Sequence, residues 1–286
     1  MTARKKQDPI GPDSMVLPEV GAWADTKYRL VEIYAQLFTA AMRGRWQRLA
    51  YIDLFAAAGL GRVRRTNRIV PGTALCALRS PTPFDRHVLA EFDPPRFEAL
   101  KARVQRDFPK ADVRFLRGDS NEIVDRVIEE LPGQGRSHSV LTFCVVDPNK
   151  VADLRFATIE RLASIDSKSR RAVDFLVLIP SFMDARRERT YYLRPSSSAL
   201  SEFLGDPNWR DDWARTKHRD FGVFVVDAFG RSMQKLGYLW DIKDAIPVGD
   251  GQKELYHLAF FSRHPLSRKF AREARKYATK QLGFQW

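Results

Sequence analysis

The sequence is poor in residues that bind metals or form disulfides. It has two cysteines and five histidines in 286 residues. Cys76 and Cys144 lie in the apolar runs TALCAL and TFCVV, a context typical of small core residues in a reducing compartment. The histidines are scattered and form no metal-ligand spacing. We therefore expect no disulfide and no metal site.

Long apolar runs are also missing. None approaches the roughly 18 residues that a membrane-spanning helix needs. The first residues, MTARKKQDPIGPDS, lack the apolar core of a signal peptide. These absences predict a cytoplasmic protein without a membrane partner. Residues 1–23 contain three prolines and few large apolar side chains, so we expect a flexible leader.

Negative charge is in deficit. The chain has 48 Lys and Arg residues against 35 Asp and Glu residues, which gives a formal net charge of +13 at pH 7. Such an excess favours a polyanionic partner, most simply nucleic acid. A general bias toward arginine, with no localised patch, would give the same number. Hydrophobic residues make up 44% of the chain, which is enough for a sizeable core.

The apolar pattern alternates between strands and helices after an amphipathic helix at 24–43. Buried strands are expected at 48–55, 87–93, 112–119, 139–148 and 174–181. Helices are expected between them at 72–80, 94–108, 121–131 and 155–165. This order predicts a parallel sheet that helices cover on both faces.

The second half of the chain adds two features. Residues 182–235 are polar, aromatic and basic, and we expect a helical insertion there. Two apolar runs at 238–248 and 253–264 flank a Gly-Asp-Gly turn, which predicts an antiparallel hairpin. We therefore expect residues 24–286 to form a single α/β domain. Its layout resembles the class I methyltransferase fold, a Rossmann relative with an antiparallel last strand.

A small-residue turn follows the first strand, in the stretch Asp53-Leu-Phe-Ala-Ala-Ala-Gly59. Small residues let the backbone approach a ligand closely. The stretch resembles methyltransferase motif I in its D-L-F-A-G-x-G form, with Ala57 where the first glycine is expected. The resemblance implies S-adenosylmethionine as cofactor, with Asp53, Phe55 and Gly59 among its contacts. Simple packing of a strand against a helix is the alternative.

Acidic residues follow the next two strands. Glu91 comes after the second strand, where a carboxylate can pair with ribose hydroxyls. Asp119 comes after the third strand, at the place where methyltransferases hold the adenine amino group. Asp119 is also a good N-cap for the helix that follows, and the two roles are compatible.

The fourth strand ends in Asp147-Pro148-Asn149-Lys150. Asp147 is a candidate to orient an amine or accept a proton, and Pro148 follows it as in the D/N-P-P-Y motif of amino-methyltransferases. Asn149 and Lys150 depart from that motif. Covalent cytosine methylation is excluded, because Cys144 lies inside the strand and no proline precedes it.

Two basic clusters are expected at the same edge of the sheet. Arg62, Arg64, Arg65 and Arg68 follow the first turn. Arg186, Arg187 and Arg189 follow the fifth strand, beside Tyr191 and Tyr192. Arginine and tyrosine together suit phosphates and bases, so we single out Arg186, Arg187 and Tyr191 as candidate substrate contacts. Solvated loops are the plain alternative.

An ordered set of motifs resembles the three-Cys-motif partner (TcmP) family over about residues 24–275. The set comprises YIDLFAAAG, GTALCAL, LAEFD, GDSNEI, VVDPNK, LIPSFMDARRER, EFLGDPNW, KLGYLW and LYHLAFFSRH. This resemblance implies a methyltransferase-like protein, with a three-Cys-motif protein that looks like a radical S-adenosylmethionine enzyme as a possible partner. Members typically carry D-L-F-A-G-P-G and D-P-Y-G, from which Ala57 and Asn149 depart.

Three functions are therefore open. The first is an S-adenosylmethionine-dependent methyltransferase that acts on nucleic acid. The second is a nucleic-acid-binding or partner module that kept the fold and lost catalysis, as the two departures would allow. The third is a metal-dependent nuclease that uses carboxylates at the sheet edge.

Overall fold

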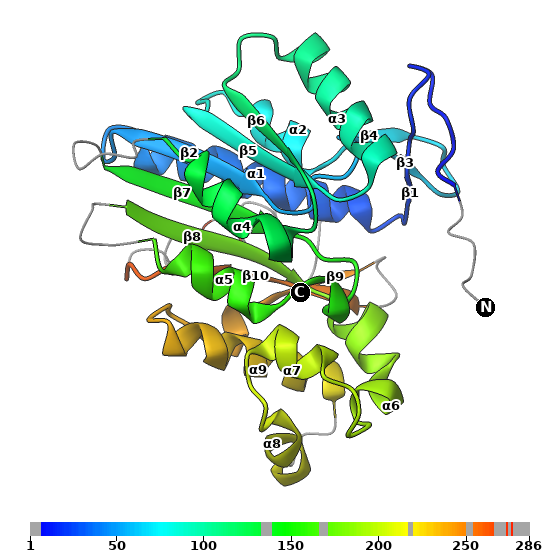
Figure 1. Ribbon diagram of the computed structural model, residues 1–286, viewed down its shortest axis with the longest axis vertical. Coiled ribbons are helices and arrows are strands. Elements are labelled where there is room, and N and C mark those ends of the chain that lie inside the picture. The colour runs from blue at the N-terminus through cyan, green and yellow to red at the C-terminus, as the bar shows by residue number, and fades with distance from the viewer. Residues whose placement is uncertain are drawn as a thin grey trace.

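The computed structural model describes residues 7–132, 139–165, 171–216, 220–249 and 254–265, together with residues 273 and 276. Its centre is a seven-stranded sheet in the order β6-β5-β2-β7-β8-β10-β9 (Figure 1). The strands are β2 (Arg48–Asp53), β5 (Arg86–Glu91), β6 (Val113–Arg117), β7 (Val140–Val146), β8 (Arg171–Ile179), β9 (Ile246–Gly249) and β10 (Glu254–Phe261).

The strand directions define the fold. β2, β5, β6, β7 and β8 pair in parallel. β10 runs antiparallel to both β8 and β9 and lies between them. A parallel sheet closed by one inserted antiparallel strand is the class I methyltransferase arrangement, so the fold predicted from the sequence is confirmed. The first strand of the predicted hairpin is shorter than expected, because a 3-10 turn (Ile242–Asp244) precedes β9. Residues 250–253 lie outside the described residues.

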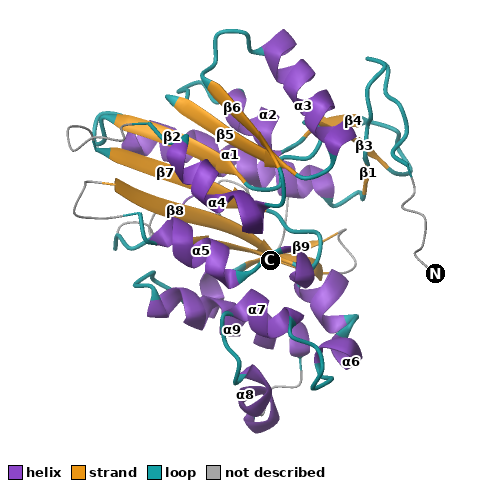
Figure 2. Cartoon of the chain, viewed as in Figure 1, coloured by secondary structure: helices purple, strands orange, loops and turns teal. Residues whose placement is uncertain are grey.

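Helices cover both faces of the sheet, as Figure 2 shows. One face carries α1 (Ala24–Met42), α2 (Thr73–Leu78) and α3 (Pro94–Asp107). The other face carries α4 (Ser120–Glu129), α5 (Phe156–Ala163), α7 (Ala199–Leu204) and α9 (Phe221–Lys235). Because β7 is buried along its whole length, its seven residues are all apolar or small.

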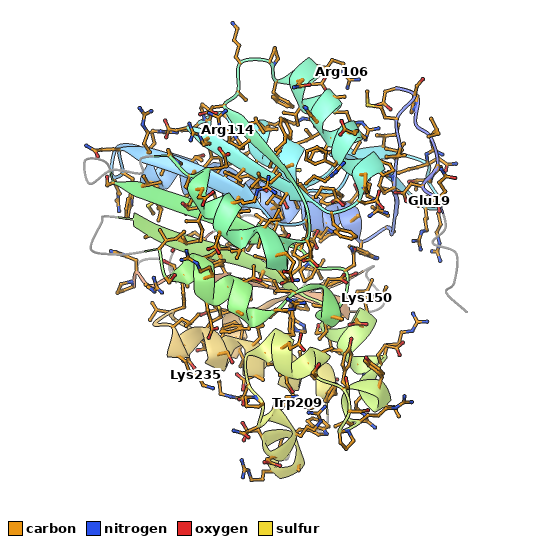
Figure 3. All side chains as sticks on the ribbon, in the orientation of Figure 1. Glu19, Arg106, Arg114, Lys150, Trp209 and Lys235 are labelled. Atoms are coloured by element: carbon orange, nitrogen blue, oxygen red, sulfur yellow. The ribbon has the colours of Figure 1, made fainter. Side chains whose placement is uncertain are left out.

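The segment expected to be an insertion at 182–235 is helical. It contains a π-helix, η3 (Ser181–Arg186), followed by α6 (Arg189–Tyr192), α7, α8 (Trp209–Arg215) and α9. Trp209, labelled in Figure 3, is fully buried and packs edge-on against Phe221. Its role is therefore packing of the helices.

A small second sheet was not predicted. β3 (Leu60–Val63) and β4 (Ile69–Pro71) form a hairpin directly after the Asp53–Gly59 turn. β1 (Glu19–Val20) pairs with β3. Figure 1 shows these three strands together beside one end of the main sheet. The first basic cluster therefore lies on a β-hairpin. The three strands of this small sheet have two to four residues each, which is too few to show a strand period in the sequence.

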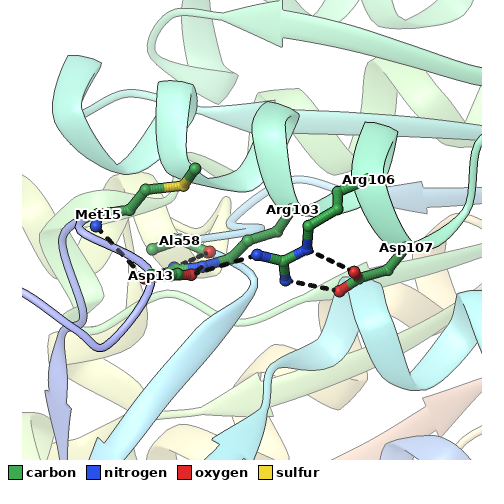
Figure 4. Close-up of polar contacts among 6 residues, drawn as sticks. All are labelled: Asp13, Met15, Ala58, Arg103, Arg106 and Asp107. Atoms are coloured by element: carbon green, nitrogen blue, oxygen red, sulfur yellow. Dashed lines mark hydrogen bonds and ion pairs between the residues drawn. The ribbon is translucent and has the colours of Figure 1, made fainter.

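Two acidic residues of the predicted leader at 1–23 contact the rest of the domain. Asp8 forms two hydrogen bonds with Arg96, and Asp13 forms two with Arg103. Arg103 is fully buried and also donates to the carbonyl of Ala58, 2.7 Å away (Figure 4). The N-terminal segment is thus tied to α3 and to the turn after β2. Residues 1–6 lie outside the described residues.

Candidate functional site

Four carboxylates lie at the carboxyl edge of the main sheet. Asp53, Glu91, Asp119 and Asp147 follow or end β2, β5, β6 and β7, which are neighbours in the order β6-β5-β2-β7. Ligands of open parallel sheets bind at this edge. Among the described residues, no group of three or more His, Cys, Asp or Glu is arranged to hold a metal ion.

Asp53 is fully buried and bonded inside the protein. Its carboxylate accepts hydrogen bonds from Thr73 Oγ1 at 2.6 Å, from the Phe55 backbone N–H at 3.1 Å and from Tyr51 Oη at 3.2 Å. Burial raises the pKa of Asp53 to about 7, against the effect of these donors. The residue thus fixes the turn to the first residue of α2.

The turn after β2 keeps a glycine-like backbone despite its alanines. Ala57 has φ +52° and Gly59 has φ +76°, both in the left-handed region that L-residues rarely adopt. A Cβ on Gly59 would lie 3.1 Å from Leu100 Cδ1. Phe55 is half-buried and packs against the core. The substitution at Ala57 therefore leaves the turn geometry in place.

Glu91 connects two parts of the edge. Its Oε1 accepts a 2.8 Å hydrogen bond from the backbone N–H of Asp93, and its side chain also accepts from the backbone of Ala57. Burial raises the pKa of Glu91, and these donors oppose the rise. Phe92, the next residue along the chain, is 66% exposed.

Asp119 is the N-cap of α4, as the sequence predicted. Its Oδ1 accepts from both the backbone N–H and the side-chain amide of Asn121, each at 2.9 Å. Both bonds use the same carboxylate oxygen, and the residue is partly exposed. The capping bonds leave Oδ2 able to accept a hydrogen bond from a ligand.

Asp147 forms an ion pair that the sequence analysis missed. Lys27 of α1 donates from Nζ to Asp147 Oδ2 at 2.6 Å, and the two side chains are 7% and 13% exposed. The Lys27 ammonium also lies over the rings of Trp23 and Tyr28. A signal existed: Lys27 is the one charged residue among the buried positions of α1. A lysine on an apolar stripe needs a buried partner.

The turn after Asp147 is anchored from the next strand. Pro148 is buried, whereas Asn149 and Lys150 are exposed; Lys150 is labelled in Figure 3. Asp184 of η3 accepts a 2.8 Å hydrogen bond from the backbone N–H of Val151 and a bond from Tyr192 Oη. The segment after β8 is therefore held directly against the β7 turn.

The candidate substrate contacts lie on this anchored segment. Arg186 and Arg187 are 60% and 72% exposed, and Tyr191 is 46% exposed. Arg186 pairs with Asp220 at 3.4 Å and lies over the ring of Phe182. Arg187 pairs with the adjacent Glu188 at 3.9 Å. These pairs are exposed and weak, so they leave the guanidinium groups available to an anion.

The four arginines of the first basic cluster, on the β3–β4 hairpin, differ in their contacts. Arg62 donates to the carbonyl of Ile10, and Arg68 pairs with Asp25. Arg64 and Arg65 are exposed, and neither forms an ion pair with another residue of the described chain. Arg65, with φ +74°, lies in the turn between β3 and β4. Arg64 and Arg65 are therefore the two exposed arginines of the β3–β4 hairpin without an ion pair in the described chain.

Comparison with known proteins gives matches to structures alone. No family model and no curated protein matches the chain. Trm1 from Pyrococcus horikoshii with S-adenosyl-L-methionine is 14% identical, with 82% of this chain and 54% of that chain covered and a TM-score of 0.42. This chain thus spans about half the length of the Trm1 chain.

Two further solved structures are similar over more of their length. Protein LPL1258 from Legionella pneumophila is 11% identical, with 88% of this chain and 91% of that chain covered and a TM-score of 0.48. Cofactor-bound Rv0187 from MTB is 16% identical, with coverage of 82% and 79% and a TM-score of 0.42. In the described part of the chain, no helix is long and apolar enough to cross a membrane.

Proposed function

We propose that this chain is a three-Cys-motif partner protein that binds S-adenosylmethionine at the carboxyl edge of β2, β5 and β6 and methylates nucleic acid. The left-handed backbone at Ala57 and Gly59 carries the cofactor part of the proposal. At Ala57, which is not a glycine, this conformation is strained, and strain persists where the surrounding structure holds it.

The residues at the edge fit the parts of this cofactor. Glu91 offers a carboxylate for the ribose hydroxyls, and Asp119 has an oxygen for the adenine amino group. Asp53 and Phe55 shape the turn from beneath, and Gly59 permits close approach. The cofactor would supply the methyl group, and Asp147 with Pro148 would face the acceptor.

Nucleic acid is the substrate class that the charge favours. Exposed arginines flank the edge on the β3–β4 hairpin and on the segment after β8, where Arg186, Arg187 and Tyr191 lie. Phosphate contacts of this kind position a nucleic acid without reading its sequence. A second protein, similar to radical S-adenosylmethionine enzymes, belongs to the same proposal as a partner.

The alternative is a nucleic-acid-binding or partner module without catalysis. Asn149 and Lys150 favour it, because they stand where amino-methyltransferases place an aromatic residue that stacks the flipped base. This alternative shares the basic surfaces and needs no cofactor.

Calorimetric titration with S-adenosylmethionine and S-adenosylhomocysteine tests the proposal. We expect micromolar binding that Glu91→Gln weakens at least tenfold and that Glu98→Gln, on the exposed side of α3, leaves unchanged. Ala57→Gly is expected to bind at least as tightly as the natural chain, since it removes a methyl group from the turn. Absence of heat in folded protein would contradict the cofactor site.

Salt dependence of binding to single-stranded RNA and DNA separates the alternative. Arg64→Ala with Arg65→Ala should reduce the slope of log K against log salt by about 1 to 2. Arg114→Ala on β6, away from the hairpin in Figure 3, is the control. Nucleic-acid binding without methyl transfer in the presence of S-adenosylmethionine would favour the non-catalytic module.

A further inference from the structure

The contact between Lys27 and Asp147 joins residues that are 120 positions apart. The ammonium has one carboxylate oxygen at 2.6 Å and the centres of two aromatic rings at 5.1 Å (Trp23) and 4.7 Å (Tyr28). An almost fully buried lysine with this surround has little rotational freedom. The position of the Asp147 carboxylate is therefore fixed from α1, outside the β-strand framework.

Within the described part of the chain, one oxygen of Asp147 is bonded. Among the residues that the structure describes, Lys27 is the hydrogen-bond partner of Asp147, and it bonds to Oδ2. An ionised carboxylate has about four acceptor positions on two oxygens. Oδ1 is thus left with its acceptor capacity, at a side chain that remains 13% exposed.

We infer that Lys27 is a positioning residue that holds Asp147 as a carboxylate through Oδ2, so that Oδ1 accepts a hydrogen bond from the exocyclic amino group of a nucleobase. This inference rests on the proposed function and names its acceptor group. Adenine, cytosine and guanine carry such an amino group, whereas uracil does not.

Lys27 favours the ionised state of Asp147. A protonated acid would present a donor O–H and a weaker acceptor. Burial raises the pKa of Asp147, and the Lys27 ammonium opposes that rise. Among the described residues, the other titratable groups that interact with this pair are Tyr28 on α1, Asp53 on β2 and Tyr256 on β10. None of these three is a cation, so Lys27 supplies the positive charge.

Lys27→Met tests the inference because it removes the charge and keeps much of the side-chain volume. We expect the pH at which the Asp147 carboxyl titrates, followed by carbon-13 NMR of labelled aspartate, to rise by at least one unit. Lys27→Arg should keep the titration near its natural position. Arg29→Met, an exposed cation on the same helix, is the control. An unchanged Asp147 titration in folded Lys27→Met would overturn the inference, whatever the activity.

Methyl transfer from labelled S-adenosylmethionine to RNA strands tests the acceptor. The probes are all-uridine strands, and the same strands with one central adenosine, cytidine or guanosine. We expect transfer to at least one amino-bearing strand, and an acid limb of the pH profile that moves to higher pH in Lys27→Met while activity recovers at high pH. A purely structural role for Lys27 would lower activity equally at every pH.

The two proposals fail in different ways. Equal transfer to the all-uridine strand would overturn the amine inference and leave the methyltransferase proposal standing. No transfer to any strand, with no binding of S-adenosylmethionine, would contradict the proposed function and with it the amine acceptor. The NMR titration would still decide whether Lys27 sets the charge of Asp147.

Discussion

Removal of the Asp13 carboxylate should destabilise the protein far more than its place in a polar N-terminal segment suggests. Asp13 accepts two hydrogen bonds from Arg103, at 2.7 Å and 2.9 Å, and Arg103 is fully buried (Figure 4). In Asp13→Ala this guanidinium loses its counter-charge but stays buried. Breaking a buried pair in this way costs about 3 to 5 kcal/mol of the free energy of unfolding.

We expect the lower part of that range, about 3 kcal/mol. Arg103 keeps its bond to the Ala58 carbonyl, and Asp13 is 18% exposed, so water can reach the site that its side chain vacates. The pKa of Asp13 is lowered, first by the hydrogen bond from Arg103. A lowered folded pKa means that this stabilisation is present above the ordinary aspartate pKa and is lost as pH falls through the folded value.

Asp8 provides a matched control. It makes the same two-bond contact with Arg96, but Arg96 is 25% exposed, whereas Arg103 is fully buried. Asp8→Ala should therefore cost only about 1 kcal/mol, as partly exposed pairs do. Urea unfolding at pH 7 measures both variants.

Equal losses of free energy in the two variants, or a loss below about 1 kcal/mol in Asp13→Ala, would show that the Arg103 pair does not act as a buried ion pair. A double variant offers a further check. Once Asp13 is absent, Arg103→Met should cost little more, because it removes the unpaired charge along with the side chain. Simple additivity of the two losses would contradict the pairing.

Two further predictions concern the core. Gly230→Ala on α9 should lower the free energy of unfolding by at least about 2 kcal/mol, because the new Cβ would lie 2.0 Å from Trp240 Cε2. Gly44→Ala is the comparison: Gly44 has φ +86° and nothing within 4 Å of the new Cβ, so it should cost about 1 kcal/mol. Urea unfolding measures both. Burial lowers the pKa of His87 to about 4, so the unfolded chain takes up a proton between pH 6.5 and 4 and the folded chain does not. His87→Phe should therefore reduce the loss of stability over that window by about 3 kcal/mol, measured by unfolding at both pH values; an unchanged difference would mean that His87 is charged when folded.

The main sheet was predictable because its strands are buried on both faces. Such strands are apolar runs of strand length, and the helices between them force a parallel order. The carboxyl ends of the strands then meet at one edge, so the sequence alone predicts that Asp53, Glu91, Asp119 and Asp147 lie at the same edge. The local capping role of Asp119 was equally readable, since it depends on residues two positions away.

Contacts between distant residues were not predictable. Asp13 and Arg103 are 90 positions apart, and Lys27 and Asp147 are 120 apart. Neither pair has a local pattern, and a proline-containing polar segment is typical of a loose leader. The clue was the buried charge itself: Lys27 lies on the apolar stripe of α1, and Arg103 lies among the buried positions of α3. Each such charge predicts a partner but does not say which one.

The four edge carboxylates differ in what the fold already asks of them. Asp53 has three donors from its own surroundings, and Asp119 has two donors on one oxygen. Substitution of Asp53 therefore acts first on the turn and on stability. Asp147 differs in its partner: one oxygen accepts from the buried ammonium of Lys27, and the other, like Oδ2 of Asp119, has no bond from the described chain. A fixed cation on one oxygen favours the ionised form of this carboxylate, so the proposed function places the acceptor group at Asp147.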